Sequence, residues 1–256
     1  MNSRVQHYLD LITVLTQKEM KVRYKSTFFG YIWSIAHPLA FAFVFFMAFK
    51  VIMRIQMEGY AVFLIAGLFP WQWLSNSVNA SPMVFITNAA LIKKVKLPRN
   101  ILPLATVLQD MIHFILSIPV IVLFLFIYHR SPSFSWLYGI PLLLIIQLLM
   151  AYGFSLAIAS INLFVRDLER LAIIGTSLLF YFTPIIYPET MIPARYKTLV
   201  LYANPLSPLM TSWRNLFLNG TLDFSLVAAS FVYSLFALML GYAVYTRLSW
   251  KFAEVL

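Results

Sequence analysis

Long apolar stretches separated by short polar segments make up most of the chain. Six of them are candidates for membrane-spanning helices, at about residues 30–53, 60–85, 102–128, 136–165, 171–187 and 224–248. About 20 helical residues cross the roughly 30 Å hydrocarbon core of a bilayer, which is close to the length of these stretches. The pattern predicts an all-α integral membrane protein with six transmembrane helices in one domain over residues 1–256.

The first 29 residues follow a different pattern. Their apolar side chains recur at the spacing of one helical face, at Val5, Tyr8, Leu9, Ile12 and Leu15. This spacing predicts an N-terminal amphipathic helix that lies on the membrane surface. The segment is too polar for a signal peptide, so we expect the N-terminus to stay inside.

Residues 188–223, between the fifth and sixth stretches, are apolar but broken by Pro188, Pro193, Pro205 and Pro208. Backbone groups that prolines leave unpaired cannot face hydrocarbon. We therefore predict a broken, re-entrant segment of two short helices that dips into the outer leaflet.

Composition supports a membrane protein. Hydrophobic residues make up 61% of the chain and charged residues only 11%, which is more apolar surface than one soluble core could bury. The chain has no cysteine, which excludes disulfides and thiolate metal sites.

The net charge of +10 has two interpretations: nucleic-acid binding, or the retention of basic loops in the cytoplasm. Thirteen of the 19 lysines and arginines fall on one side of the predicted topology. This asymmetry favours the second interpretation. It predicts a multi-pass protein of the inner (plasma) membrane with both termini cytoplasmic, membrane lipids as neighbours and no nucleic-acid partner.

Motifs for catalysis and cofactor binding are absent from the sequence. There is no GxxxxGK[ST] loop for nucleotide phosphates and no HExxH motif, and the four histidines are scattered. We expect no catalytic residue, no metal site and no cofactor on this chain. Any ATP must be hydrolysed by a partner protein.

Asp110 and His113 lie three residues apart in the third stretch and therefore on one helical face. Titratable residues inside a membrane are candidates for function, so the pair could form a proton relay. The alternative that we favour is a hydrogen-bonded structural pair or a partner for a basic residue near the inner membrane surface.

Aromatic residues gather in the first and fifth stretches, at Phe41, Phe45, Phe49, Phe180, Tyr181 and Tyr187. In many bundles such residues face lipid or fill the core. They could instead line a pore on which sugar rings slide, because an aromatic ring meets the C–H face of a sugar without binding it tightly.

Three groups of motifs lie along nearly the whole chain. The first is VRYKS at residues 22–26, GYIW at 30–33 and HP at 37–38. The second is AGLFPW at 66–71, LIKKVKLPR at 91–99 and LPL at 102–104. The third is RD at 166–167, TPIIYP at 183–188, NPL at 204–206 and Arg214.

In order and spacing, these motifs resemble the permeases of ABC-2 type polysaccharide exporters, which transport O-antigen, capsule and teichoic acid. The O-antigen members are the most similar. The sequence departs from the pattern at Leu97, where relatives often carry phenylalanine.

The resemblance implies a homodimer bound to two copies of a separate ABC ATPase, which would hold ATP and Mg²⁺. The substrate would be an undecaprenyl-linked polysaccharide, exported from the cytoplasmic to the outer side of the membrane. Residues 90–99 would form a coupling helix on the ATPase. The coupling residues would be Leu91, Lys93, Lys94, Lys96, Pro98 and Arg99, with Arg166 and Asp167 as a second contact. Topology anchoring alone is the alternative for this loop.

Two further sets of residues follow from the resemblance. The carrier pyrophosphate would approach Lys21, Arg23 and Lys25, for which simple anchoring at the anionic membrane surface is the alternative. An outer gate would comprise Pro184, Pro188, Asn204, Pro205 and Arg214.

Other functions remain open from the sequence. An ABC-2 exporter of teichoic acid, capsule, a small lipid or a drug would share the fold. A secondary carrier would need paired acidic residues at midmembrane and inverted halves, and a membrane enzyme would need clustered carboxylates or histidines.

Overall fold

The computed structural model describes residues 3–24, 32–52, 54, 57–95 and 97–255. Over these residues the regular structure is entirely helical, which confirms the predicted all-α class. Within the described residues, three helices are long and apolar enough to cross a membrane. They are α6 (Ile101–Ile127), α7 (Trp136–Asn162) and α11 (Phe224–Leu248), and they correspond to the third, fourth and sixth predicted spans.

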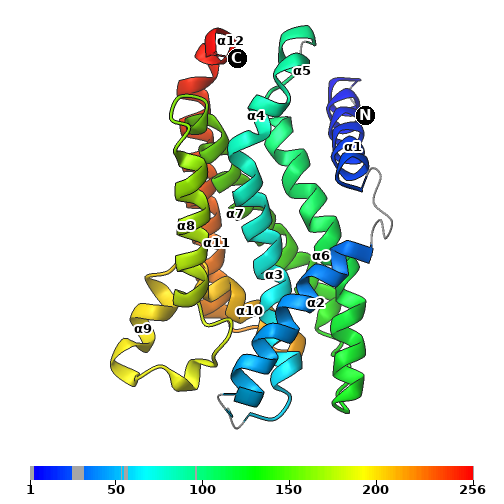
Figure 1. Ribbon diagram of the computed structural model, residues 1–256, viewed down its shortest axis with the longest axis vertical. Coiled ribbons are helices and arrows are strands. Elements are labelled where there is room, and N and C mark those ends of the chain that lie inside the picture. Colours follow the sequence, from blue (N-terminus) through cyan, green and yellow to red (C-terminus); the bar gives the residue numbers. More distant parts are fainter. Residues whose placement is uncertain (1–2, 25–31, 53, 55–56, 96, 256) are drawn as a thin grey trace.

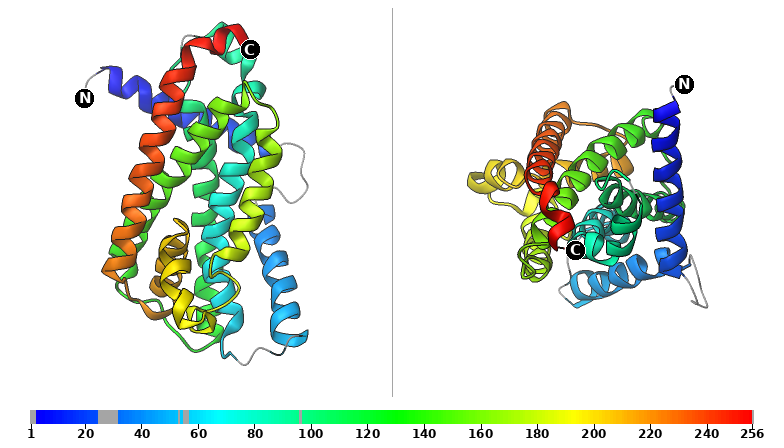
Figure 2. Two further views of the ribbon diagram at one scale, coloured as in Figure 1. Left: turned by 90° about the vertical axis from the view of Figure 1, so that its left-hand side faces the viewer. Right: turned by 90° about the horizontal axis from the view of Figure 1, so that it is seen from above.

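The other three predicted spans correspond to shorter or more polar helices. They are α2 (Trp33–Phe46) with its π-helical continuation η2 (Met47–Ile52), α3 (Tyr60–Ala80) and α8 (Leu168–Phe182). All three run beside the longer helices along the long axis of the molecule (Figures 1 and 2). The helix α3 is the most enclosed, and its second half carries polar side chains that lower its hydropathy.

Two predicted spans have different ends in the structure. The second was predicted to run to residue 85, but α3 stops at Ala80 and the turn η3 (Ser81–Met83) separates it from α4 (Val84–Thr87). Pro82 lies in that turn and has no amide hydrogen to continue the helix. The fifth was predicted over residues 171–187, but α8 begins at Leu168 and ends at Phe182.

Pro184 explains the early end of α8. A proline restricts the preceding residue to extended backbone, and Thr183 has φ −94° and ψ 135°.

The predicted coupling helix over residues 90–99 is shorter than expected. The structure has α5 (Ala89–Lys94), after which Val95 is extended, with φ −123° and ψ 131°. Lys96 lies outside the described residues. The prediction of helix was wrong for Pro98, which lies outside any helix, and for Arg99, which lies in a turn. Pro98 restricts the residue before it to extended backbone, so a helix cannot continue through this point.

The N-terminal helix is present as α1 (Ser3–Tyr24) and lies against one side of the bundle near its end, roughly perpendicular to the long axis (Figure 2). It packs on α6 with Leu15 buried, whereas Leu9 and Val14 are exposed. The predicted apolar face therefore lies partly against the bundle.

Two short helices follow α8, as predicted for the proline-rich segment. After the turn η4 (Glu189–Met191) come α9 (Ala194–Tyr202) and α10 (Ser207–Asn219). They lie at the end of the bundle opposite α1 and α5 (Figure 1). The helix α10 is largely buried, with Trp213 and Leu216 fully enclosed.

The buried side chains form two clusters. The larger one fills the space between α3, α6, α7 and α10. The smaller one surrounds Phe252 at the end where α1, α5 and the C-terminal helix α12 (Phe252–Val255) meet (Figure 1).

Candidate functional site

A cavity of about 250 Å³ opens between α2, α3 and α8. Aromatic side chains form one part of its lining and uncharged polar side chains the other. The lining residues are Phe41, Phe45, Leu68, Trp71, Gln72, Ser75, Asn76, Asn79, Thr176, Ser177, Phe180 and Tyr181. We call this space the central cavity.

The aromatic part joins α2 to α8. Along α2, the ring centroids of Phe41 and Phe45 are 6.4 Å apart and those of Phe45 and Phe49 are 6.3 Å apart. The Phe45 ring also lies 5.3 Å from that of Phe180, which in turn lies 5.3 Å from Tyr181. These are ordinary distances for interacting aromatic pairs.

Four of the six aromatic residues predicted to line a pore therefore meet at the central cavity: Phe41, Phe45, Phe180 and Tyr181. Phe49 lies one turn further along and is not part of the lining. Tyr187 lies beyond the end of α8, where its hydroxyl donates a hydrogen bond to the backbone oxygen of Tyr181 at 3.1 Å. Pore lining itself stays a prediction.

Sequence reasoning missed the polar part of the lining, which comes mainly from α3 as Gln72, Ser75, Asn76 and Asn79. The signal was present, because these positions recur at helical spacing in an apolar stretch. Thr176 on α8 faces them and donates a hydrogen bond from Oγ1 to Asn79 Oδ1 at 3.0 Å.

The residues predicted to form an outer gate gather around the turn after α8. Arg214 on α10 is 4% exposed, and its Nη2 donates to the backbone oxygens of Pro184 at 2.5 Å and Ile185 at 2.9 Å. Its guanidinium lies 3.9 Å from the centre of the Phe63 ring. A buried cation needs such partners, so the turn and Arg214 hold each other in place.

Two further contacts fix this turn. The side-chain Nδ2 of Asn204 donates to Thr183 Oγ1 at 2.8 Å, and the Tyr60 hydroxyl donates to the backbone oxygen of Ile186 at 2.8 Å. Pro188 precedes η4, and Pro205 lies between α9 and α10. The structure thus brings Pro184, Asn204 and Arg214 together, with the other two prolines flanking them.

The predicted coupling residues lie at the opposite end. Lys93, Lys94, Arg166 and Asp167 are exposed, as is Pro98. Leu91 instead packs against the smaller buried cluster. Arg99 is half-buried and donates a hydrogen bond to the backbone oxygen of Ser249.

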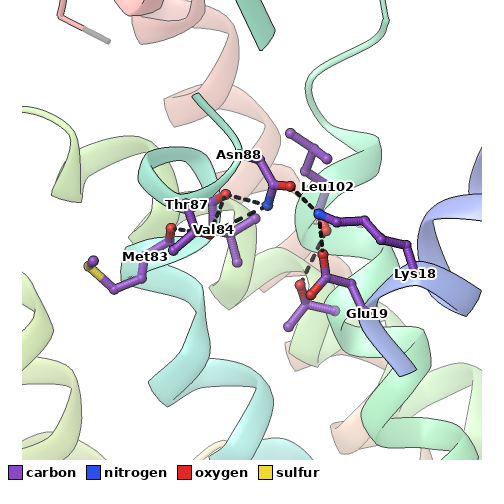
Figure 3. Close-up of polar contacts among 8 residues, drawn as sticks. Lys18, Glu19, Met83, Val84, Thr87, Asn88 and Leu102 are labelled. Carbon is purple, nitrogen blue, oxygen red and sulfur yellow. Dashed lines mark hydrogen bonds and ion pairs between the residues drawn. The ribbon is translucent and has the colours of Figure 1, made fainter. Parts of the chain in front are cut away.

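The N-terminal helix is tied to the start of α5. Lys18 Nζ donates to Asn88 Oδ1 at 2.5 Å and contacts Glu19 Oε1 at 3.1 Å (Figure 3). Asn88 in turn donates to the backbone oxygen of Val84 at 2.9 Å. These contacts join α1 to the α4–α5 junction.

The structure describes only part of the predicted pyrophosphate site. The side chain of Lys21 is exposed on α1. Lys25 and the side chain of Arg23 lie outside the described part of the chain.

Asp110 and His113 are both buried on α6, where Asp110 Oδ2 accepts a hydrogen bond from Ser77 at 3.0 Å. They line a small cavity of about 30 Å³ together with Gln72 and Asn76. Among the described residues no three histidine, aspartate or glutamate side chains form a cluster for a metal ion.

Comparison with known proteins gives the family. Residues 10–218 match the family described as ABC-2 type transporter. The chain belongs to the ABC-2 type transporter family.

The curated relatives match over most of their length. Two O-antigen export system permease proteins, named RfbA, from Klebsiella pneumoniae are each 44% identical to this ABC-2 type transporter over 256 residues. Each match covers 100% of this chain and 98% of the relative. A protein of the same name from Myxococcus xanthus is 31% identical over 211 residues, covering 82% of this chain and 81% of the relative.

An ABC-2 type transporter is a permease subunit in a membrane, and among the described residues three helices are long and apolar enough to cross one. Such a permease is not itself a catalytic enzyme, and it implies an ABC ATPase as partner.

Proposed function

We propose that this chain is the transmembrane subunit of an ATP-driven exporter that moves a lipid-linked polysaccharide of the O-antigen type. The direction would be from the cytoplasmic to the outer side of the inner membrane. The names of the relatives support this proposal, because the similarity extends over the whole chain.

The central cavity is the observation on which the proposal depends. Its lining joins aromatic rings to hydroxyl and carboxamide groups, and among the described residues no charged side chain belongs to it. Rings match the C–H faces of sugars, and the polar groups match sugar hydroxyls. A hydrophobic drug or an acyl chain would leave those polar groups unpaired, which is unfavourable away from water. The lining therefore favours a glycan over a drug or small lipid.

We further propose a homodimer with two copies of the ABC ATPase, which would bind ATP and Mg²⁺. The central cavity lies at the edge of one chain, and the neighbouring surfaces of α2 and α8 expose large apolar side chains such as Phe43, Val44 and Ile174. A second copy related by a two-fold axis would close this side, since the same patch meets itself in such a dimer.

The topology in this proposal has six spans with both termini cytoplasmic. The bundle end that carries α1, α5 and α12 would face the cytoplasm, because Lys93, Lys94 and Arg166 lie there. The segment of α9 and α10 would then lie in the outer leaflet.

The mechanism follows from this arrangement. The undecaprenyl pyrophosphate head would meet Lys21 with Arg23 and Lys25 at the inner surface. ATP binding would act on α5 and on the turn at Arg166 and Asp167, and would separate α2 from α8 at the dimer interface. Sugars would then pass along the aromatic rings, and the turn held by Arg214 would open.

Reconstitution of the chain with its ABC ATPase in vesicles tests the proposal. With the ATPase facing outward, addition of ATP and undecaprenyl-linked O-antigen glycan should stimulate ATP hydrolysis and deliver glycan to the lumen. Undecaprenyl pyrophosphate without sugars is the matched control and should give little delivery. Stimulation by a hydrophobic drug with no response to the glycan would contradict the proposal.

A further inference from the structure

Three cavities lie along one face of α3, and carboxamide side chains of that helix line each of them. The first is the central cavity. The second is the small cavity at Asp110 and His113, and the third has a volume of about 340 Å³ and lies between α1, α3, α4 and α6. Gln72 lines the first and second, Asn79 lines the first and third, and Asn76 lines all three.

Positions 72, 76 and 79 are four and three residues apart, so their side chains share one face of the helix. The third cavity includes Glu19 and Asn88, which lie at the end of the bundle with α1 and α5. The α3 face therefore connects that end with the aromatic rings of the central cavity.

The hydrogen bonding of these carboxamides differs. Asn79 accepts a bond from Thr176. Within the residues that the structure describes, the carboxamides of Gln72 and Asn76 form no hydrogen bond with protein. Both side chains are half-buried and point toward cavity space.

Gln147 on α7 is a carboxamide with a structural role in this bundle and serves for comparison. It is fully buried, its Nε2 donates to the backbone oxygen of Pro70 at 2.7 Å, and its Oε1 accepts from Trp213 Nε1 at 2.6 Å. Both ends are satisfied, as expected for a polar group away from water. By contrast, the donors and acceptors of Gln72 and Asn76 are available to whatever occupies the cavity.

The hydrogen-bonding groups and the charge of the site limit the chemical class of ligand that it can bind. Each carboxamide offers two N–H donors and one carbonyl acceptor and carries no charge. No cation of the described part of the chain lines the central cavity, so a pyrophosphate group would find no counter-charge from these residues. A neutral group with many hydroxyls fits both the amides and the facing rings of Phe45 and Phe180.

We infer that Gln72 and Asn76 form a hydrogen-bonding subsite for sugar hydroxyls on α3, facing the aromatic rings of α2 and α8. This inference rests on the proposed function and adds to it the two residues that would recognise the glycan by hydrogen bonds. The subsite recognises the sugar and not the lipid carrier.

The absence of cysteine from the natural sequence allows a direct test. Gln72→Cys and Asn76→Cys variants, in complex with the ATPase in vesicles, are treated with a charged, membrane-impermeant thiol reagent. Ala66→Cys, at a fully buried position on the same helix, is the matched control. We expect positions 72 and 76 to react, position 66 not to react, and undecaprenyl-linked glycan to protect the two reactive positions.

Undecaprenyl pyrophosphate without sugars shows whether the glycan or its lipid carrier protects the two cysteines. If it protects as well as the glycan does, the site binds the carrier and the inference is wrong. Lack of reaction at positions 72 and 76, or reaction without protection by glycan, also overturns it.

A second experiment measures transport. Gln72→Met combined with Asn76→Leu keeps the approximate side-chain size and removes the hydrogen bonds, and should slow glycan export roughly tenfold. Asn76→Gln should retain export, because it keeps the carboxamide. Asn219→Leu removes an exposed carboxamide at the end of α10 and should export at the wild-type rate.

The result also distinguishes this inference from the proposed function. If the wild-type complex exports glycan and the double variant exports it at the same rate, the subsite is wrong and the proposed function is unaffected. A wild-type complex that exports no glycan would overturn the proposed function itself.

Discussion

The guanidinium of Arg99 donates a hydrogen bond from Nη1 to the backbone oxygen of Ser249, with 2.7 Å between the two atoms. The two residues are 150 positions apart in the sequence. The same guanidinium lies 5.9 Å from the ring of Phe252, which is fully buried and 4.9 Å from the Phe85 ring. The turn after α5 is thus joined to the C-terminal end of α11.

This contact predicts how Arg99 affects transport. In Arg99→Ala the charged hydrogen bond is lost, which should destabilise this end of the bundle by about 1.5–3 kcal/mol. The turn after α5 would then move independently of α11, so ATP hydrolysis should continue while glycan export falls. Arg99→Lys keeps a donor and should recover part of the export. Membrane insertion should be intact in both variants, and unchanged export by Arg99→Ala would contradict the prediction.

Arg214 should be the most sensitive single position at the other end. Arg214→Met removes both bonds to the turn after α8 and leaves the two backbone oxygens without this partner. We expect the free energy of unfolding to fall by about 2–4 kcal/mol. The decrease is smaller than the sum of the lost contacts, because the variant also avoids the cost of desolvating a buried cation. Arg195→Met on α9 removes an exposed cation near Tyr196 and serves as control. Equal melting temperatures for the two variants would refute this view of Arg214.

Gly67 allows Arg214 to reach that turn. A Cβ atom at position 67 would lie 2.7 Å from Arg214 Nη2, which is too close. Gly67→Ala should therefore displace the guanidinium and lower the melting temperature. In the Arg214→Met background the same change should have a much smaller effect, and this double-mutant comparison measures the coupling. Additive effects would show that the two residues act independently.

The crossing of α7 and α11 depends on glycine in the same way. A Cβ atom at Gly153 would lie 2.4 Å from the backbone of Ala237, so Gly153→Ala should force the helices apart at a cost of about 1–3 kcal/mol. Gly175 on α8 has nothing within 4 Å of the corresponding position. Gly175→Ala should be neutral or stabilise by up to about 1 kcal/mol through helix propensity. Thermal unfolding in detergent compares the two variants, and the reverse order would be inconsistent with this close packing.

Asp223 caps the start of α11, accepting hydrogen bonds from the Ser225 backbone nitrogen at 2.8 Å and from Ser225 Oγ at 2.6 Å. The Ser225 hydroxyl and then its backbone N–H hold the pKa of the Asp223 carboxyl below its usual value. The pKa of Asp223 is lower in the folded than in the unfolded state, so its ionised carboxylate stabilises the fold. This stabilisation is complete above the unfolded pKa of about 3.9 and is lost as the pH falls through the folded pKa.

Asp223→Ala should therefore lower stability by about 0.5–2 kcal/mol near neutral pH. The difference from wild type should shrink once the pH falls below the lowered pKa. Asp223→Asn retains a cap without a titratable group and is the control. Melting temperatures measured across that pH range check the prediction, and a constant difference between Asp223→Ala and wild type would exclude the carboxylate as its cause.

Much of the helix layout followed from the sequence. Apolar length predicted α6, α7 and α11 to within a few residues, and the prolines after α8 predicted two short helices there. The turn at Pro82 and the end of α8 before Pro184 were missed, although both have a local cause. Hydropathy and proline geometry act over a few residues, which is why a sequence reveals them.

The candidate site was only partly predictable. The spacing of Phe41 and Phe45 marked one aromatic face, but packing decided that Phe180 would meet it and that α3 would turn Gln72 and Asn76 toward the same space. The pairing of Arg214 with the Pro184 carbonyl and of Arg99 with Ser249 likewise required the tertiary structure. A sequence determines which residues share a helical face and which segments prefer lipid. Which faces meet depends on how all the side chains pack at once, and only the folded chain decides that.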